Sequence, residues 1–407
     1  MDAASTSIDA EKNIAGICAS LCAGGYSVKL RGFSAIDKYL GLPPLPFAWA
    51  ETDADIAVLA RVIENLRFPG VDVADAAADA PGGTCYFRCL DSDEPKEPAF
   101  SFPLLSFGYD WQTRRFQDPL GVYPLLQALL RKSPEEPQSG KKALPEEGGN
   151  ACPHNADPYR FIMDASLALA RYGFPACAKI PSGSLPAPLP GPELQRAFLS
   201  CLLVSPRPDR GLEFLKRSGF LEALWPELAC LDDVDHSKEF HPEGNVWNHT
   251  LETFRHRKTA RGGAFDLRLS LGLLLHDAGK PISASSGSHR FDGHAELGAK
   301  AATRFLERLE FEPSLIRDIF YLVKNHMLPA ALKRLPLAKT AETMASPLFP
   351  TLMELYRCDE SSSFKGLDGY YENSAAYQAY LRNMKNPYRS ADGKKMGKKE
   401  RRRQSWG

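Results

Sequence analysis

The stretch that most constrains this chain is Leu271–Pro281, with the sequence LGLLLHDAGKP. An apolar run carries His276 and Asp277 side by side, and the Gly279 and proline that follow predict the end of a buried helix. Unpaired polar groups in a buried site are costly. A divalent metal ion removes that cost, because imidazole nitrogen and carboxylate oxygen are ligands of Zn, Mn, Fe, Ni and Co. The stretch therefore predicts one edge of a metal site.

Further ligand candidates lie near the ends of other segments with helical periodicity. A turn containing a tryptophan leads into the helix that carries His249, an amphipathic helix begins near His294, and two more apolar helices end near His326 and Asp359. A single histidine on an apolar helix is more often a core residue than a ligand. The candidate set of metal ligands is His249, His276, Asp277, His294, His326 and Asp359.

The order of these residues, His…His-Asp…His…His…Asp, resembles the HD phosphohydrolase superfamily. The resemblance implies that His249, His276, Asp277 and Asp359 hold one metal ion, as the four-residue core does in that superfamily. It further implies that His294 and His326 mark a member with two metal ions, in which Asp277 is the bridging ligand. The expected cofactor is one or two divalent ions from among Mn, Ni, Co, Fe, Zn and Mg.

Charge and cysteine content exclude several classes of protein. The chain has 50 basic and 50 acidic residues, so no overall field favours nucleic acid or a membrane. The 9 cysteines are scattered and contain no CxxC pair, which indicates reduced thiols in a cytoplasm. The polar, acidic amino terminus does not read as a signal peptide, and no apolar stretch approaches the roughly 20 residues of a membrane span. We expect a cytoplasmic protein with no membrane partner.

A second motif lies near the amino terminus. Asp53 and Asp55 form a DxD pair after the segment RGFSAIDKYLG. Two carboxylates at this spacing share a face if they lie on a strand, where they can hold Mg²⁺; the alternative is an acidic turn. This order of segments resembles the family of class II tRNA nucleotidyltransferases and bacterial poly(A) polymerases. The chain departs from the family's glycine-rich motif at Phe33 and Ile36, where the family has glycine and arginine.

The same resemblance continues into the helix that begins ADPYRFIMDA. In the family, residues at the positions of Asp157 and Arg160 read the incoming base by hydrogen bonds. An alternative needs no nucleotide: Asp157 caps the helix, Pro158 occupies its first turn, and Arg160 is a surface residue. With Asp53 and Asp55, these two residues are the candidate nucleotide-binding set.

The predicted fold class is α+β and mostly helical. We expect a small mixed α/β nucleotidyltransferase-like head over residues 1–132 and a flexible linker over 133–156, which is rich in Pro, Gly and charged residues. An all-α neck and body over 157–235, resembling the family's RNA-binding part, precedes an all-α HD domain over 236–385. A basic tail over 386–407 is expected to be disordered.

The expected function is hydrolysis of a nucleotide or RNA-end phosphoester at the metal site, with a nucleotidyltransferase-like head that has lost its activity. Asp277, His276 and Lys280 are the expected catalytic residues, and Arg290 and Lys324 the expected phosphate-binding residues. One alternative is an active tRNA nucleotidyltransferase or poly(A) polymerase that adds nucleotides to RNA 3′ ends. A second is a non-catalytic RNA-binding protein with a structural metal ion. In each case tRNA is a candidate partner.

Overall fold

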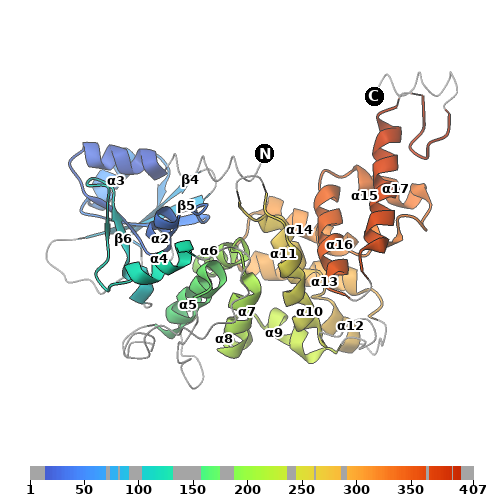
Figure 1. Cartoon of the computed structure of the whole chain (residues 1–407), viewed down its shortest axis with the longest axis horizontal. Coiled ribbons are helices and arrows are strands. Elements are labelled where there is room, and N and C mark those ends of the chain that lie inside the picture. The colour runs from blue at the N-terminus through green and yellow to red at the C-terminus, as the bar shows by residue number, and fades with distance from the viewer. Residues whose placement is uncertain are drawn as a thin grey trace. The chain divides into compact units, whose positions relative to one another are not determined.

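The protein is described from a computed structural model. The structure describes residues 14–69, 74–80, 83–90, 103–131, 157–174, 188–235, 244–260, 263–285, 291–363, 366–386 and 388–395. The predicted linker and residues 396–407 of the predicted basic tail lie outside these ranges. The chain divides into two compact units, Met1–Pro226 with Lys258–Leu267, and Glu227–Arg257 with Arg268–Gly407. Each unit is considered by itself, and Figure 1 labels the elements of both.

The first unit contains a seven-stranded sheet with the order β3-β4-β5-β2-β1-β6-β7. β2 and β5 pair in parallel, and the other neighbouring strands are antiparallel. Crossing from β2 to a parallel neighbour requires a long connection, and helix α3 with β3 and β4 provides it. The strands are β1 (Val28–Arg31), β2 (Phe47–Thr52), β3 (Leu66–Arg67), β4 (Ala76–Ala80), β5 (Gly83–Cys89), β6 (Gly108–Asp110) and β7 (Arg115–Gln117).

Helix α5 (Pro158–Tyr172) is fastened to helix α2 (Phe33–Leu40) by buried polar contacts. Arg171 Nε donates to Asp37 Oδ1 at 2.7 Å, and the Tyr172 hydroxyl donates to the same oxygen at 2.8 Å. Arg171 also donates to the carbonyl oxygen of Pro43. A buried charge pair with extra hydrogen bonds has its desolvation cost offset, and losing either partner is strongly destabilising. This network therefore holds α5 in a definite position against the head.

The two departures from the family's motif are core residues. Phe33 and Ile36 are both buried in α2, and the Phe33 ring stacks on Tyr172 with centroids 6.1 Å apart. Phe33 is 2% exposed and Ile36 is fully buried. We infer that these two residues serve to pack α2 against its neighbours.

The remaining helices of the first unit follow the predicted apolar periodicity. α6 buries Phe198 and Leu202, and α8 packs Phe220 against Trp225 with ring centroids 5.0 Å apart. The bounds are α3 (Ile56–Val62), α4 (Tyr123–Arg131), α6 (Pro192–Leu203), α7 (Pro208–Arg217) and α8 (Phe220–Leu224).

The second unit is all helical in its described part, apart from short turns and isolated bridges. Its helices are α9 (Pro226–Ala229, which begins at the unit boundary), α10 (Val246–Thr253), α11 (Leu267–Leu275), α12 (Lys280–Ser285), α13 (His294–Arg308), α14 (Pro313–Asn325), α15 (Leu337–Ala345), α16 (Phe349–Ser361) and α17 (Asp368–Met384). A mixed sheet in one unit and helices elsewhere confirm the predicted α+β class. Among the described residues, no helix combines the length and apolar character that crossing a membrane requires.

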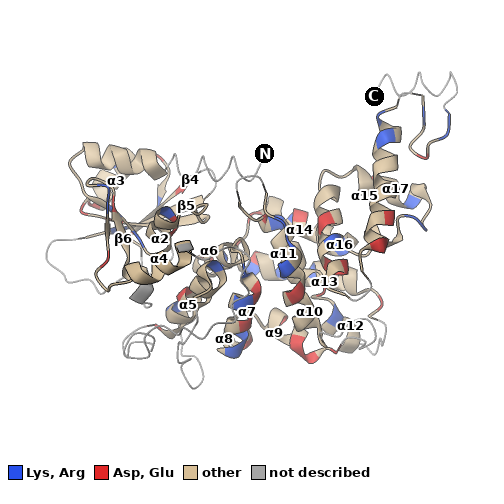
Figure 2. Ribbon diagram, in the orientation of Figure 1, with Lys and Arg blue, Asp and Glu red and all other residues tan. Residues whose placement is uncertain are grey.

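Acidic and basic side chains are interspersed over the helices of both units (Figure 2). This agrees with the equal numbers of basic and acidic residues in the chain. Any electrostatic recognition must therefore come from a local arrangement of charges.

Candidate metal centre

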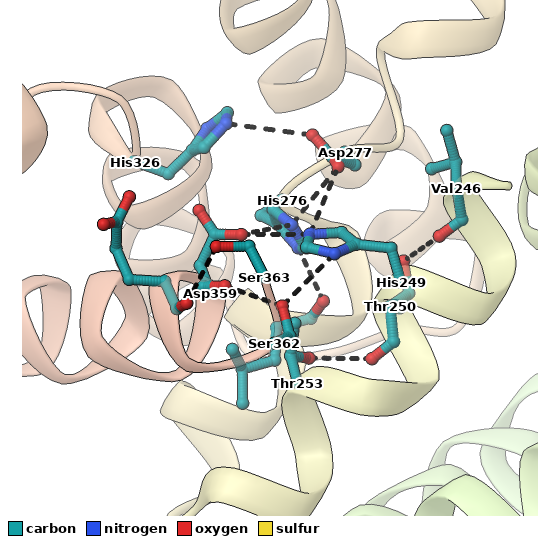
Figure 3. Close-up of polar contacts among 12 residues, drawn as sticks. Val246, His249, Thr250, Thr253, His276, Asp277, His326, Asp359, Ser362 and Ser363 are labelled. Carbon is teal, nitrogen blue, oxygen red and sulfur yellow. Dashed lines mark hydrogen bonds and ion pairs between the residues drawn. The ribbon is translucent and has the colours of Figure 1, made fainter. Parts of the chain in front are cut away.

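The second unit brings the ligand candidates together from five places in the sequence. His249 lies in α10, and His276 and Asp277 directly follow α11. His294 is the first residue of α13, His326 follows the last turn of α14, and the last turn of α16 carries Asp359. Figure 3 shows the side chains of His249, His276, Asp277, His326 and Asp359 directed towards one another. His276, His294 and His326 lie at helix ends, and His249 lies within the short helix α10.

The candidates form two groups, which we name site A and site B. Site A comprises His249, His276 and Asp359, and site B comprises Asp277, His294 and His326. Within each group the three ligand atoms lie within 4.8 Å of one another. In site A, His249 Nε2 is 2.9 Å and His276 Nε2 is 3.9 Å from Asp359 Oδ1. Three histidine and carboxylate ligands per group are typical of a divalent metal site with open positions.

Asp277 connects the two sites. Its Oδ2 lies 3.3 Å from His276 Nε2 and 4.0 Å from His249 Nε2, on the side of site A. Its Oδ1 lies 3.7 Å from His294 Nε2, in site B. One carboxylate thus presents one oxygen to each group, which is the arrangement of a bridging ligand.

Hydrogen bonds at Nδ1 orient the imidazoles. His276, His294 and His326 each place Nδ1 2.7–2.8 Å from the backbone carbonyl oxygen three residues earlier. A carbonyl oxygen can only accept, so Nδ1 carries the proton and donates it. The neutral rings therefore expose the Nε2 lone pair to the centre, as metal coordination requires.

His249 obtains the same orientation from a side chain. The Ser362 hydroxyl donates to the Asp359 carbonyl oxygen at 2.6 Å, so its oxygen accepts from His249 Nδ1 at 3.2 Å. This leaves His249 Nε2 facing a carboxylate oxygen of Asp359. A lone pair beside a carboxylate is unfavourable unless a positive charge lies between them. Sequence reasoning missed Ser362, although its place one helical turn after Asp359 was a usable signal.

The polar atoms of the centre fit a bound cation. The Nε2 atoms of His294 and His326 are 3.1 Å apart, and neither carries a proton in the tautomer described above. His276 Nε2 is buried with no hydrogen-bond partner among the described residues. Buried unsatisfied groups carry a desolvation cost that metal coordination removes.

The ionisation of the centre also suits metal binding. Burial lowers the pKa of His326 to about 4, with a contribution from His276, so its ring is neutral at pH 7. Burial likewise lowers the pKa of His294. Burial alone would raise the pKa of Asp277, but the charges of His276 and Lys280 outweigh it and hold that pKa well below its usual value. His294 and His326 therefore favour the neutral imidazole, and Asp277 the ionised carboxylate, which are the forms that bind a metal ion.

Lys280 is the predicted catalytic residue that is not a ligand. Its Nζ lies 2.6 Å from Asp277 Oδ2, and its side chain is largely buried. Gly279 permits this geometry for a reason other than a helix stop: a Cβ there would lie 2.0 Å from the His294 carbonyl oxygen. The chain between α11 and α12 thus passes directly against the start of α13. Of the predicted phosphate-binding residues, Lys324 is exposed on α14, and Arg290 lies outside the described residues.

The candidate nucleotide-binding residues lie in the first unit. Asp53 and Asp55 follow the end of β2 and are not within a strand. Asp53 Oδ1 accepts from the Ser27 backbone N–H at 2.7 Å, and Asp55 Oδ1 caps α3 by accepting from the Val58 N–H at 2.7 Å. Each carboxylate therefore has a structural hydrogen bond through one oxygen.

The two predicted nucleotide-binding residues of the neck helix, Asp157 and Arg160, have different surroundings. Asp157 Oδ1 caps α5 by accepting from the Tyr159 N–H at 2.9 Å. Arg160 is buried, in contrast to the surface position of the alternative interpretation, and its guanidinium carbon lies 5.6 Å from the Trp49 ring centroid. Trp49 in turn stacks on Tyr86 with centroids 4.8 Å apart. Trp49 was not among the predicted site residues.

Comparison with known proteins finds one matching family model and several similar enzymes. Residues 246–355 match the family model described as HD domain. The chain is 36% identical over 146 residues to the CC-adding tRNA nucleotidyltransferase of Thermus thermophilus, covering 35% of this chain and 33% of that protein. It is 36% identical over 126 residues to the multifunctional CCA protein of Halorhodospira halophila, covering 31% and 29%. The aligned segments span about a third of the length of these relatives.

These comparisons correct the expected function. The expectation of a phosphohydrolase with an inactive head is wrong, because the relatives are named for nucleotide addition to tRNA. That expectation depended on Phe33 and Ile36, which the structure places in the core of α2. The predicted resemblance, in contrast, is confirmed. The chain is similar to a named tRNA nucleotidyltransferase over about a third of its length, and residues 246–355 match the HD domain model.

Proposed function

We propose that this chain is a tRNA nucleotidyltransferase, which transfers nucleotides from nucleoside triphosphates to the 3′ end of tRNA. The observation that carries the proposal is the 36% identity over 146 residues to an enzyme named CC-adding tRNA nucleotidyltransferase. The mixed sheet followed by helices is consistent with it. Because the match spans a third of that enzyme, the activity of the whole chain is our inference.

Asp53 and Asp55 are the proposed ligands of catalytic Mg²⁺. They follow the end of β2, and Asp110 ends β6 on the other side of β1. The carboxylates of Asp110 and Asp53 both contribute, after burial, to raising the pKa of the Cys22 thiol, so they lie close to the same group. Carboxylates gathered at one end of a sheet suit Mg²⁺, which neutralises the phosphates during nucleotidyl transfer.

Arg160 is proposed to contact the incoming nucleotide, and Trp49 is proposed to position it. The Arg160 guanidinium lies 5.6 Å from the Trp49 ring centroid, and Trp49 is itself buried. An arginine can donate to base edges or phosphates. The network of Asp37, Arg171 and Tyr172 keeps α5, and with it Arg160, in place.

Sites A and B are proposed to hold two divalent ions, bridged by Asp277. Divalent ions at such sites polarise phosphoryl oxygens. Lys280 is proposed to hold Asp277 ionised and oriented through its contact at 2.6 Å. Histidine and carboxylate ligands accept several metals, so geometry alone selects none of them.

Incorporation of labelled CTP or ATP into tRNA that lacks its terminal CCA, with Mg²⁺ present, tests the transferase proposal. The test variant is Asp55→Asn, because an asparagine preserves the α3 cap while removing the carboxylate charge. We expect the wild type to incorporate label and Asp55→Asn to lose at least about 100-fold in rate, on the scale of catalytic groups. Asp277→Ala is the matched control in the other unit and should retain incorporation. Absence of incorporation by folded wild type would refute the proposal.

A further inference from the structure

Helices α13 and α14 form an antiparallel hairpin that leads away from the metal centre. α13 begins at His294 and α14 ends just before His326. The Nε2 atoms of these two histidines are 3.1 Å apart. The turn between the helices, at Leu309–Glu312, is therefore at the far end. Fifteen helical residues span about 22 Å at 1.5 Å per residue, so the hairpin surface extends well beyond the centre.

A groove follows the outer side of this hairpin. Lys300, Arg304 and Glu307 line it from α13, and Arg317 and Phe320 line it from α14, with Ile316 in its floor. Lys300 and Arg304 are one helical turn apart, so they lie on the same face of α13. All three basic residues are exposed. The groove thus carries three cations and one carboxylate in a chain with equal numbers of acidic and basic residues.

The cations of the groove differ from other basic residues on the same unit. Arg308 of α13 pairs with Glu227 at 2.7 Å, and Arg268 pairs with Asp318 of α14 at 2.7 Å. Among the described residues, Lys300, Arg304 and Arg317 form no ion pair. Their positive charge is therefore available to a ligand.

An exposed aromatic ring completes the groove. Phe320 is 37% exposed. Lys324 lies one helical turn later in α14, and its Nζ is 5.8 Å from the centroid of the Phe320 ring. A single exposed apolar side chain needs no partner, but this ring lies in the same groove as Lys300, Arg304 and Arg317. Cations along a groove with an accessible aromatic ring are the features by which proteins bind single-stranded nucleic acid without sequence preference.

We propose that this groove binds the backbone of a single RNA strand, with phosphates at Lys300, Arg304 and Arg317 and a base stacked on Phe320. Lys300 and Phe320 lie at the end of the groove nearer in sequence to His294 and His326, and Pro313 lies at the other end. The proposal does not depend on nucleotidyl transfer, which is assigned to the first unit.

Fluorescence anisotropy of a labelled 12-nucleotide single-stranded RNA, titrated with the full chain at several salt concentrations, tests this inference. The groove variant is Lys300→Glu/Arg304→Glu/Arg317→Glu. The control is Lys339→Glu/Arg382→Glu/Lys385→Glu, which changes exposed residues on and just after α15 and α17 by the same charge. We expect the groove variant to bind at least ~10-fold more weakly, and the slope of log K against log salt to fall by about 2, since each phosphate contact contributes about 0.7.

Phe320→Ala provides a second measurement that leaves the charge unchanged. Loss of a base stack should weaken binding about 10-fold while leaving the salt slope as in the wild type. Circular dichroism of each variant establishes that it is folded. Equal affinity of groove and control variants for the RNA would overturn the proposal. So would competition by a polyglutamate peptide as effective as that by unlabelled RNA, which would identify an acidic protein as the ligand.

Discussion

The metal centre of the second unit and the carboxylates of the first unit show two different uses of the same side chains. In the centre, each imidazole Nδ1 is held by a hydrogen bond, so the Nε2 atoms and carboxylate oxygens face one small volume. In the first unit, Asp53, Asp55 and Asp157 each accept a backbone N–H through one oxygen. The centre directs several ligand atoms at one small volume, whereas the carboxylates of the first unit are engaged with the backbone.

This difference makes the two regions respond differently to substitution. Loss of a ligand in the centre should change metal binding greatly. Loss of a head carboxylate should change stability by the modest amount of a helix cap, and should change activity only if it also binds Mg²⁺.

The largest effect is expected for Asp277→Ala, because Asp277 faces both sites. Outer-shell partners of a metal ligand are worth roughly 10–100-fold in affinity, and a bridging ligand should exceed that. We expect two metal ions per wild-type chain and none in the variant, measured by elemental analysis after dialysis. Glu296→Ala is the control, since Glu296 is an exposed carboxylate two residues after His294. Two retained ions in Asp277→Ala would contradict the bridging assignment.

The second prediction concerns pH and the metal-free protein. The pKa of His326 is about 4 in the folded state and 6.5 in the unfolded state, so between these values the unfolded chain binds more protons. Stability should therefore fall as pH decreases from 6.5 towards 4, by up to about 3 kcal/mol. Urea unfolding in chelator across this range measures the slope, and His326→Gln should reduce it. An unchanged slope in that variant would indicate that another group titrates.

The third prediction concerns how His249 is oriented. Ser362→Ala removes the acceptor of the His249 Nδ1–H, so we expect metal affinity about 10-fold weaker, the lower end for outer-shell partners. Ser363→Ala is a close control, because the Ser363 hydroxyl donates to the Glu360 carbonyl oxygen. Calorimetric titration with Mn²⁺ compares the two. Similar affinities would show that Ser362 is dispensable.

The smallest effect is expected in the head. Asp55→Ala should lower the free energy of unfolding by about 1 kcal/mol through loss of the α3 cap, whereas Asp55→Asn should change it by only a few tenths. Thermal or urea unfolding of the two variants gives the comparison. If Asp55→Asn is as destabilising as Asp55→Ala, the carboxylate charge itself stabilises the head, and the contrast between the two regions is weaker than we describe.

Much of the centre could be predicted because its ligands fall at helix ends that the sequence marks. His276 and Asp277 follow an apolar run, and His294 begins an amphipathic segment. Ser362 was missed because a serine in the last turn of a helix is ordinary in sequence and acquires its role only from the position of His249 in α10. Gly279 was expected only to end a helix. In the structure its backbone lies so close to the start of α13 that a side chain there would clash with the His294 carbonyl oxygen.

The head was harder to predict. The spacing of Asp53 and Asp55 suggested a strand, but the strand ends at Thr52 and Asp55 caps the following helix. Phe33 and Ile36 appeared to block a phosphate site, yet they pack in the core. Whether a side chain faces a ligand or the core depends on neighbours such as Tyr172, which is distant in sequence.

The sequence by itself determined the α+β class, the order of the candidate ligands and the resemblance to tRNA nucleotidyltransferases, because helical periodicity and motif order are local properties. Only the tertiary structure decided which oxygen of Asp277 faces each site, which imidazole nitrogens are exposed, and that unpaired cations meet Phe320 along α13 and α14. Those features depend on contacts between helices far apart in the chain, and backbone packing sets them.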